Sequence, residues 1–375
     1  MTDFEAPIPF LDLRAQYAGL QPDLLAAVTA VFEQQQFILG PQVEALENEL
    51  ANWLDGPLVI TCASGTDALH LALLALEIGS GDEVITTPFS FFATAGAIAL
   101  AGACPVFVDI DPVTFNLDPA HIESAITSRT RALLPVHIFG LPADMDAIQS
   151  IAIRHNLMVI EDAAQAIGAK YQDRPVGTIG NIGCFSFYPT KNLGGAGDGG
   201  MLATRDEALA RRLRLLRVHG SNQPYHHELL GLNSRLDVLQ AAVLGVKLSH
   251  LSAWNQARRQ IAQAYWDLML AAGLDQRLQL PSVPSGSIPV WHQFVVRLPQ
   301  RDAARDFLSA RGIATQIYYP VPLHLQPALS HLGYQAGDFP HAERTCREVL
   351  ALPIYPELTP AQQRQIVAAL SDFFP

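Results

Sequence analysis

The chain has 375 residues, of which 49% are hydrophobic and only 16% are charged. This length favours two domains and is ample for a large hydrophobic core. The formal net charge of −12 argues against a binding surface for nucleic acid or for an anionic membrane.

Targeting and redox signals predict a cytoplasmic protein. The longest apolar run, residues 95–108, is too short to span a bilayer and contains Pro105. No basic region precedes an apolar stretch at the N-terminus, so no signal peptide is expected. The cysteines at positions 62, 104, 184 and 346 lie far apart and form no Cys-x-x-Cys pair. This spacing predicts buried free thiols and neither a disulfide framework nor a metal site.

Apolar periodicity predicts alternating helices and strands after a lead-in segment at residues 1–20. Helices are expected at 22–32, 43–53, 68–76, 121–127, 145–155 and around 211–217, and a further helix that follows residues 88–94 is expected to end at residue 101. Strands are expected at 58–61, 83–87, 106–109, 131–137, 157–162, 184–188 and 200–204. Such alternation is typical of βαβ units, so we predict an α/β fold with a parallel or mixed sheet.

A different pattern follows the helix predicted at 238–251. A long helix at 251–271 is followed by a loop at 281–289, which is rich in Pro, Ser and Gly. A strand at 294–298 and helices at 302–311 and 360–373 complete the chain. We therefore expect a large domain over residues 1–250 and a smaller α+β domain over residues 251–375.

The stretch from residue 157 to 200 carries the strongest functional signal. Its first strand ends at Glu161 and Asp162, as expected for a buried parallel strand that opens into a site. Lys191 follows the next strand and lies between aromatic residues and a glycine-rich loop. An amine in such surroundings can act as a nucleophile that traps a carbonyl group.

The small number of lysines adds to this signal, because the chain has only three. Lys170 fits an exposed hairpin, and Lys247 lies on an amphipathic helix. Of the three lysines, only Lys191 has the aromatic and glycine-rich surroundings expected of a nucleophilic amine.

Three further motifs bear on ligand binding. Ser-Gly-Thr at 64–66 opens a helix after a strand and can present N–H groups to a phosphate, although a simple N-cap fits equally well. The aromatic residues at 89–92 suit either a core or a flat ligand. Residues 195–200 match Gly-x-Gly-x-x-Gly, but they precede a strand instead of opening a helix, which excludes a dinucleotide fingerprint.

Together the motifs at 63–69 (ASGTDAL), 161–165 (EDAAQ) and 185–192 (FSFYPTKN) resemble those of the DegT/DnrJ/EryC1/StrS group. These are nucleotide-sugar aminotransferases that depend on pyridoxal 5'-phosphate. The resemblance extends from Phe10 to Pro356. It implies the fold-type-I architecture and a homodimer whose active sites are shared between subunits.

The resemblance also implies roles for single residues. Lys191 would bind the cofactor covalently and move protons, and Asp162 would keep the pyridine nitrogen protonated. The other implied cofactor contacts are Gly65, Thr66 and Ser186 at the phosphate with Asn233 of the partner subunit, Gln165 at the phenolic oxygen, and Phe91 stacked on the ring. The implied substrate contacts are His219, Arg235, Tyr318 and Tyr319, of which the two tyrosines also suit core packing.

Tyr188 bears on the position of amination. Relatives that aminate C3 of the sugar resemble this chain in having an aromatic residue three positions before the lysine, where those that aminate C4 have His. Tyr188 also suits a purely structural place on its strand. The resemblance thus implies transfer from L-glutamate to a nucleotide-linked 3-keto-6-deoxyhexose, with dTDP favoured over UDP. The alternatives are a UDP-linked 3-keto hexuronic acid, a 4-keto sugar, and a regulatory protein that only binds the cofactor.

Overall fold

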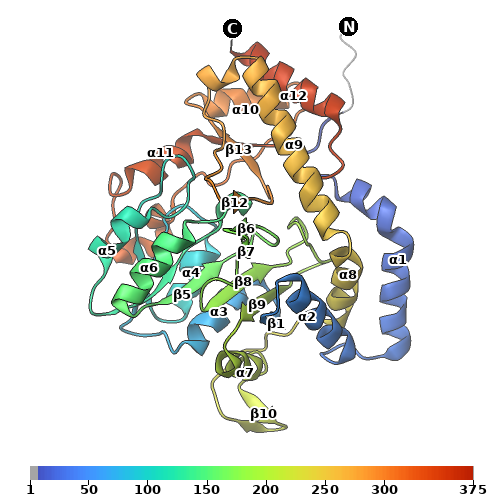
Figure 1. Cartoon of the computed structure of the whole chain (residues 1–375), viewed down its shortest axis with the longest axis vertical. Helices are drawn as coiled ribbons and strands as arrows, with labels where there is room; N and C mark the ends of the chain where they lie inside the picture. The colour runs from blue at the N-terminus through green and yellow to red at the C-terminus, as the bar shows by residue number, and fades with distance from the viewer. Residues whose placement is uncertain (1–6, 375) are drawn as a thin grey trace.

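A seven-stranded sheet forms the centre of the computed structural model, which describes residues 7–374 (Figure 1). The strand order is β1-β9-β8-β5-β4-β2-β3. Strand β9 runs antiparallel to both of its neighbours, and the other pairings are parallel. The strands are β1 (Leu58–Cys62), β2 (Glu83–Thr86), β3 (Cys104–Phe107), β4 (Thr130–Leu134), β5 (Met158–Asp162), β8 (Ile182–Ser186) and β9 (Gly200–Thr204). The predicted α/β class with a mixed, mostly parallel sheet is confirmed.

Helices cover both faces of this sheet because successive side chains of each strand point to opposite sides. On β5, Val159 belongs to the apolar cluster that also contains residues of α2, α6 and α8, whereas Ile160 belongs to the cluster that contains residues of α3, α4 and α7. The helices of this part are α1 (Leu13–Gln34), α2 (Pro41–Trp53), α3 (Gly65–Ala75), α4 (Ala93–Leu100), α5 (Ile122–Ala125), α6 (Met145–His155), α7 (Glu207–Leu216) and α8 (Val238–Leu248). The sheet is therefore buried between two apolar layers, and its strand ends remain available for a site.

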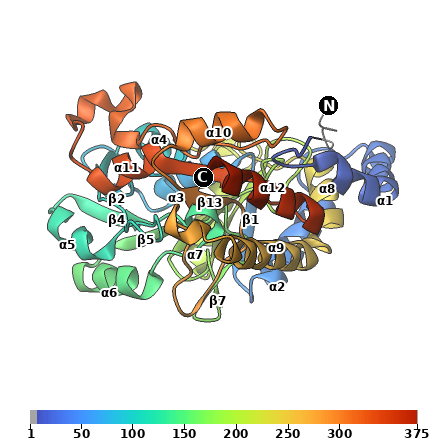
Figure 2. The same cartoon turned by 90° about the horizontal axis from the view of Figure 1, so that it is seen from above.

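A second apolar core lies in the C-terminal part of the chain, where β13 (Phe294–Arg297) pairs antiparallel with β14 (Val349–Leu352). Tyr265 and Phe294 are fully buried in this core. The surrounding helices are α9 (Leu251–Ala271), α10 (Arg301–Ser309), α11 (Pro340–Glu348) and α12 (Pro360–Phe373). Figure 2 shows α10 and α12 on the side of the molecule away from α6. The boundary between residues 250 and 251 stays a prediction.

The N-terminal lead-in joins this second core. Ile8 is buried in it and forms an isolated parallel bridge with Ile313. The backbone bonds from Ile8 N to Gly312 O (2.8 Å) and from Ala314 N to Ile8 O (3.0 Å) hold this contact. The beginning of the chain is thus attached to its C-terminal part.

Several boundaries differ from the prediction for identifiable reasons. Helix α1 begins at Leu13, well before residue 22, because Asp12 accepts hydrogen bonds from Arg14 N and Ala15 N as its N-cap. Strand β8 ends at Ser186, so Tyr188 lies in the loop after it. Strand β14 and helix α11 were not predicted from the sequence. The same holds for β10 (Ser221–Gln223), β11 (His226–His227), β12 (Ser287–Ile288) and short 3-10 helices at Pro119–His121, Ile138–Gly140, Leu274–Gln276, Leu323–Leu325 and Pro327–Leu332.

One prediction about side-chain environment, the burial of Cys104, is corrected by the structure. Cys104 is exposed, because it begins the edge strand β3, whereas the other three cysteines are buried. Lys247 is buried and its Nζ donates to the carbonyl of Gly194 at 2.8 Å. The predicted hairpin around Lys170 is confirmed as β6 (Lys170–Tyr171) paired with β7 (Arg174–Pro175). Within residues 7–374, no helix combines the length and apolarity needed to cross a bilayer.

Candidate active site

Asp162 lies at the carboxyl end of β5, in the middle of the sheet. Its Oδ2 accepts a hydrogen bond from Thr94 Oγ1 at 2.8 Å, and its Oδ1 accepts one from Ala164 N at 3.2 Å. Burial raises the pKa of Asp162, while these bonds and the charge of Lys191 lower it. The result is a buried carboxylate in fixed orientation that favours a nearby cation.

Lys191 supplies the amine of the site from the loop after β8. The bond from Lys191 N to Tyr188 O, 2.8 Å long, closes the turn that carries it. Burial lowers the pKa of Lys191 to about 8, although the charge of Asp162 acts in the opposite direction. A substantial fraction of the amine is therefore neutral near physiological pH and can attack a carbonyl carbon.

The loop around Lys191 is held by residues that the sequence alone did not single out. Asn192 Nδ2 donates to Asn255 Oδ1 at 2.8 Å and to Val290 O at 3.0 Å. A Cβ atom on Gly194 would lie 2.3 Å from Pro189 O, so only glycine fits there. Polar residues on α8 and α9 give no local signal for such contacts, because their partners lie far away in the sequence.

The start of α3 and the end of β8 form a cup that suits a phosphate. A Cβ atom on Gly65 would lie 2.7 Å from the Cβ of Ser186 and 3.1 Å from its Oγ. The Ser64 side chain caps the helix by accepting from Asp67 N at 3.0 Å. This brings the Ser186 hydroxyl to the first turn of α3, where Thr66 also lies and where free N–H groups and the helix dipole favour an anion.

Gln165, Phe91 and Tyr319 form one wall near Asp162. Gln165 Oε1 accepts from Phe139 N at 2.7 Å, and its Nε2 donates to the Tyr319 hydroxyl at 3.0 Å. The Phe91 ring is 58% exposed and lies 6.3 Å from that of Tyr319. An exposed ring here suits a flat ligand. Because both ends of the Gln165 amide already have partners, its contact with the phenolic oxygen stays a prediction.

Glu161 does not face the site. Both carboxylate oxygens are buried, and they accept from the backbone of residues 177–180, with Gly177 N at 2.6 Å and Ile179 N at 2.7 Å. His137 Nε2 lies 3.0 Å from the same carboxylate, and His137 Nδ1 accepts from Ala143 N. Glu161 thus holds the loop before β8 in place.

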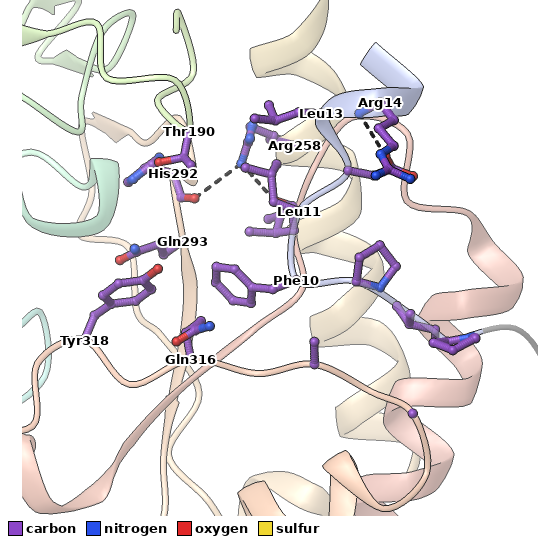
Figure 3. Close-up of a pocket in the computed structure, with 17 residues that line it drawn as sticks. Phe10, Leu11, Leu13, Arg14, Thr190, Arg258, His292, Gln293, Gln316 and Tyr318 are labelled. Carbon is purple, nitrogen blue, oxygen red and sulfur yellow. Dashed lines mark hydrogen bonds between the residues drawn. The ribbon is translucent and has the colours of Figure 1, made fainter. Parts of the chain in front are cut away.

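A cavity of about 830 Å³ lies beside Lys191, between the lead-in segment and the C-terminal part (Figure 3). Tyr318, Thr190 and His292 contribute to its wall. Tyr188 is 53% exposed, and its charge when ionised raises the pKa of Tyr318, after the larger effect of burial. Burial lowers the pKa of His292 well below its ordinary value, and the charge of Lys191 adds to this effect.

The remaining predicted residues lie on the segments that follow α7. His219 and Asn233 are exposed and Arg235 is partly buried. The adjacent Ser234 donates from its Oγ to Asp67 Oδ2 at 2.6 Å, which places this segment at the start of α3. The roles implied for His219, Asn233 and Arg235 involve a second subunit, and they stay predictions.

These residues together fit pyridoxal 5'-phosphate. The site offers an amine with a lowered pKa, a buried carboxylate for a ring nitrogen, and a cup at Gly65 that any larger residue would fill. Lys191 would hold the aldehyde carbon, Asp162 the ring nitrogen, and Gly65, Thr66 and Ser186 the phosphate.

Comparison with known proteins agrees with this fit. The model of the DegT/DnrJ/EryC1/StrS aminotransferase family matches residues 20–371. The chain is 50% identical to a "Pleiotropic regulatory protein" of Geobacillus stearothermophilus, covering 98% of each chain. It is also 50% identical to a UDP-N-acetyl-3-dehydro-alpha-D-glucosamine 3-aminotransferase of Acidithiobacillus ferrooxidans (97% of each), and 46% identical to a dTDP-3-amino-3,4,6-trideoxy-alpha-D-glucose transaminase of Streptomyces venezuelae (98% and 96%).

A solved structure gives the same result. The crystal structure of DesV from S. venezuelae in complex with a ketimine intermediate superposes with a TM-score of 0.95 at 46% identity, covering 98% of this chain and 99% of that one. The fold inferred from the sequence is therefore that of known aminotransferases.

Proposed function

Because the chain belongs to the DegT/DnrJ/EryC1/StrS aminotransferase family, we propose that it transfers an amino group to the C3 carbonyl of a nucleotide-linked 3-keto sugar. The observation that carries this proposal is the Lys191 amine, with a pKa lowered to about 8, next to the buried carboxylate of Asp162. Two relatives named for 3-amino sugars, one at 50% and one at 46% identity, support C3 as the position of amination.

Each residue of the site has a separate role in the proposed reaction. Pyridoxal phosphate, when bound, supplies an electron sink that stabilises negative charge on the carbon losing its proton. Lys191 would hold the cofactor and would move a proton at the substrate carbon. Asp162, oriented by Thr94 and Ala164, would keep the ring nitrogen protonated, because an anion close to that nitrogen favours the charged form. The cup at Gly65 and Ser186 would hold the phosphate.

For the sugar we propose a 6-deoxyhexose carried by dTDP, with L-glutamate as donor. The dTDP-specific name of one relative supports this choice. A UDP-linked substrate has a specific observation in its favour, because a relative of higher identity is named for a UDP-linked 3-dehydro sugar. We propose further that the enzyme works in the cytoplasm as a homodimer with shared sites, in which His219, Asn233 and Arg235 serve the partner's substrate and cofactor.

A regulatory role is the second candidate, because one relative at 50% identity is named a pleiotropic regulatory protein. A protein that only bound the cofactor would not need an amine of lowered pKa beside a buried carboxylate. The two functions differ in turnover, so the same assay separates them.

The test is to supply purified enzyme with glutamate and with matched 3-keto and 4-keto nucleotide sugars, each carried by dTDP and by UDP. Mass spectrometry of the product should show amination of a 3-keto sugar, and Lys191→Ala should show none. Faster turnover of the 4-keto sugars would contradict C3 amination. An absence of turnover with every sugar, in enzyme that has bound cofactor, would favour regulation.

A further inference from the structure

The cavity between the lead-in segment and the C-terminal part contains two polar side chains, Arg258 and Gln293, to which the roles above assign no function. It measures about 830 Å³ and is lined by Phe10, Arg258, Gln293 and Tyr318, among others. Figure 3 shows Arg258 between the lead-in segment at Leu11 and Leu13 and the loop at His292.

Arg258 is a buried cation without a carboxylate hydrogen-bonded to it. Only 4% of the residue is exposed. Its Nη1 donates to three backbone carbonyls, those of Trp291 (3.1 Å), His292 (3.3 Å) and Ile354 (3.0 Å). Its Nε has no partner. Burial lowers the pKa of Arg258 to about 10, against the opposing field of Glu357. A charge buried in this way is costly unless an anion pairs with it.

A second unpartnered group faces the same cavity. Gln293 is 5% exposed, and its buried Oε1 has no hydrogen-bond partner. The amide can also be turned to present its NH₂ group, so it can serve a donor or an acceptor. Buried polar groups are almost always satisfied in native proteins. Two unsatisfied groups on one cavity wall therefore indicate a polar ligand.

The hydrogen bonds of Arg258 indicate which class of ligand the cavity can bind. Because Nη1 is engaged by carbonyls and Nε is closed to solvent, Nη2, which donates no hydrogen bond within residues 7–374, is the nitrogen that remains for a ligand. A carboxylate oxygen binds such a nitrogen through a charge-assisted hydrogen bond. A planar carboxylate would also supply the missing negative charge.

The cavity is also connected to the reacting amine. The carbonyl of His292 accepts from Arg258, and the His292 ring Nδ1 lies 3.2 Å from Asn192 Oδ1. Asn192 directly follows Lys191 in the chain. Arg258 is thus linked through two contacts to Asn192, the residue after Lys191.

We propose that Arg258 binds a carboxylate of the amino-acid donor, with Gln293 as a further hydrogen-bonding group. This inference rests on the proposed aminotransferase function and assigns its donor subsite. A carboxylated sugar, such as a 3-keto hexuronic acid, has the same chemistry and is the other possible source.

The test measures binding of glutarate, a dicarboxylate without an amine, to the holoenzyme by calorimetry. We expect Arg258→Gln to weaken glutarate binding by about tenfold or more and to leave the affinity for a neutral 3-keto nucleotide sugar unchanged. The matched control is Arg259→Gln, one position further on α9, which is outside the cavity lining and should leave both affinities unchanged. Unchanged glutarate affinity in Arg258→Gln would overturn the proposal. If Arg258→Gln lost affinity only for a hexuronate sugar, Arg258 would bind the carboxylate of the sugar and not that of the donor.

A second variant covers the case in which Arg258→Gln does not fold. Asp12 lines the same cavity and caps α1, and Asn caps helices equally well. Asp12→Asn should therefore fold and should bind glutarate about two- to fivefold more tightly, because a repelling charge is removed. Unchanged or weaker binding would count against the subsite. In parallel, glutamate is added to the wild-type holoenzyme, and the loss of the cofactor's visible absorbance is recorded. If the wild type showed no such loss, the aminotransferase function would be refuted, and not only the donor subsite.

Discussion

Gly65 and Ser186 approach so closely that a Cβ atom on Gly65 would lie 2.7 Å from the Cβ of Ser186. The contact joins the first turn of α3 to the last residue of β8, and the cup for the phosphate lies there. Gly65→Ala should displace one of these elements and weaken cofactor binding at least tenfold, with an overpacking cost of about 1–3 kcal/mol. Equilibrium dialysis and thermal unfolding measure both effects. Gly19→Ala, on α1 with open space around it, is the control: it should leave cofactor binding unchanged and should raise the free energy of unfolding by about 0.5–1 kcal/mol, because alanine favours a helix interior.

Lys191 should be the residue that carries the cofactor. Borohydride reduction of the holoenzyme followed by peptide mapping should place the label on Lys191. The buried Lys247, whose amine is bonded to the Gly194 carbonyl, and Lys170 serve as internal controls. A label on either of them would contradict the assignment.

The lowered pKa of Lys191 predicts a pH dependence of apoprotein stability. The folded value is about 8, whereas the unfolded amine has its ordinary value near 10.5. Between these two values the unfolded state binds more protons, so stability should rise with pH across this window. Lys191→Met should stabilise the apoprotein at pH 7 by about 1–2 kcal/mol, after a discount for partial exposure.

Urea unfolding of both apoproteins at several pH values measures this difference. The gain from Lys191→Met should shrink as the pH rises through the window and should vanish above it. A gain independent of pH would show that packing, and not the buried charge, is responsible.

Asp162 and Glu161 are adjacent, and their substitution should have different consequences. Asp162→Asn should fold and bind cofactor, yet slow the half-reaction with glutamate by about a hundredfold or more, because the ring nitrogen loses its anion. Glu161→Gln should instead lower the melting temperature, since Gly177 N, Ile179 N and His137 depend on its carboxylate. Single-turnover absorbance and calorimetry distinguish the two outcomes, and a catalytic loss without destabilisation in Glu161→Gln would contradict this division.

Shared sites predict complementation between inactive subunits. Lys191→Ala and Asn233→Ala homodimers should each be inactive or nearly so. A refolded one-to-one mixture, about half of which is heterodimer, should recover up to about a quarter of the wild-type activity, and the purified heterodimer, which has one intact site of two, up to about half. Differently tagged subunits allow the heterodimer to be purified before assay. Purified heterodimer without activity would place Asn233 outside the partner's site.

The main features of the site were predictable from the sequence because each has a local signal. Asp162 ends an apolar strand, and Lys191 stands in an aromatic and glycine-rich loop. The contacts that position them were not predictable. Thr94 reaches Asp162, and Asn255 reaches Asn192, across long sequence separations that leave no periodic pattern.

The same reasoning explains the errors in the fold. Cys104 was expected to be buried, but burial of a strand depends on its place in the sheet, and β3 lies at the edge. Helix α1 was expected to begin at residue 22, because the apolar residues that share one helical face lie between residues 24 and 32. The cap at Asp12 and the packing of α1 on α8 extend the helix beyond that apolar stretch.

The bridge between Ile8 and Ile313 has a consequence for the order of synthesis. The lead-in segment leaves the ribosome long before its partner, so the large sheet and its helices can fold first while this segment stays without its binding surface. The cavity wall at Phe10 and Asp12 is then completed only when residues 312–318 arrive. An enzyme released before that point would contain Lys191 and Asp162 and still lack the finished compartment beside them.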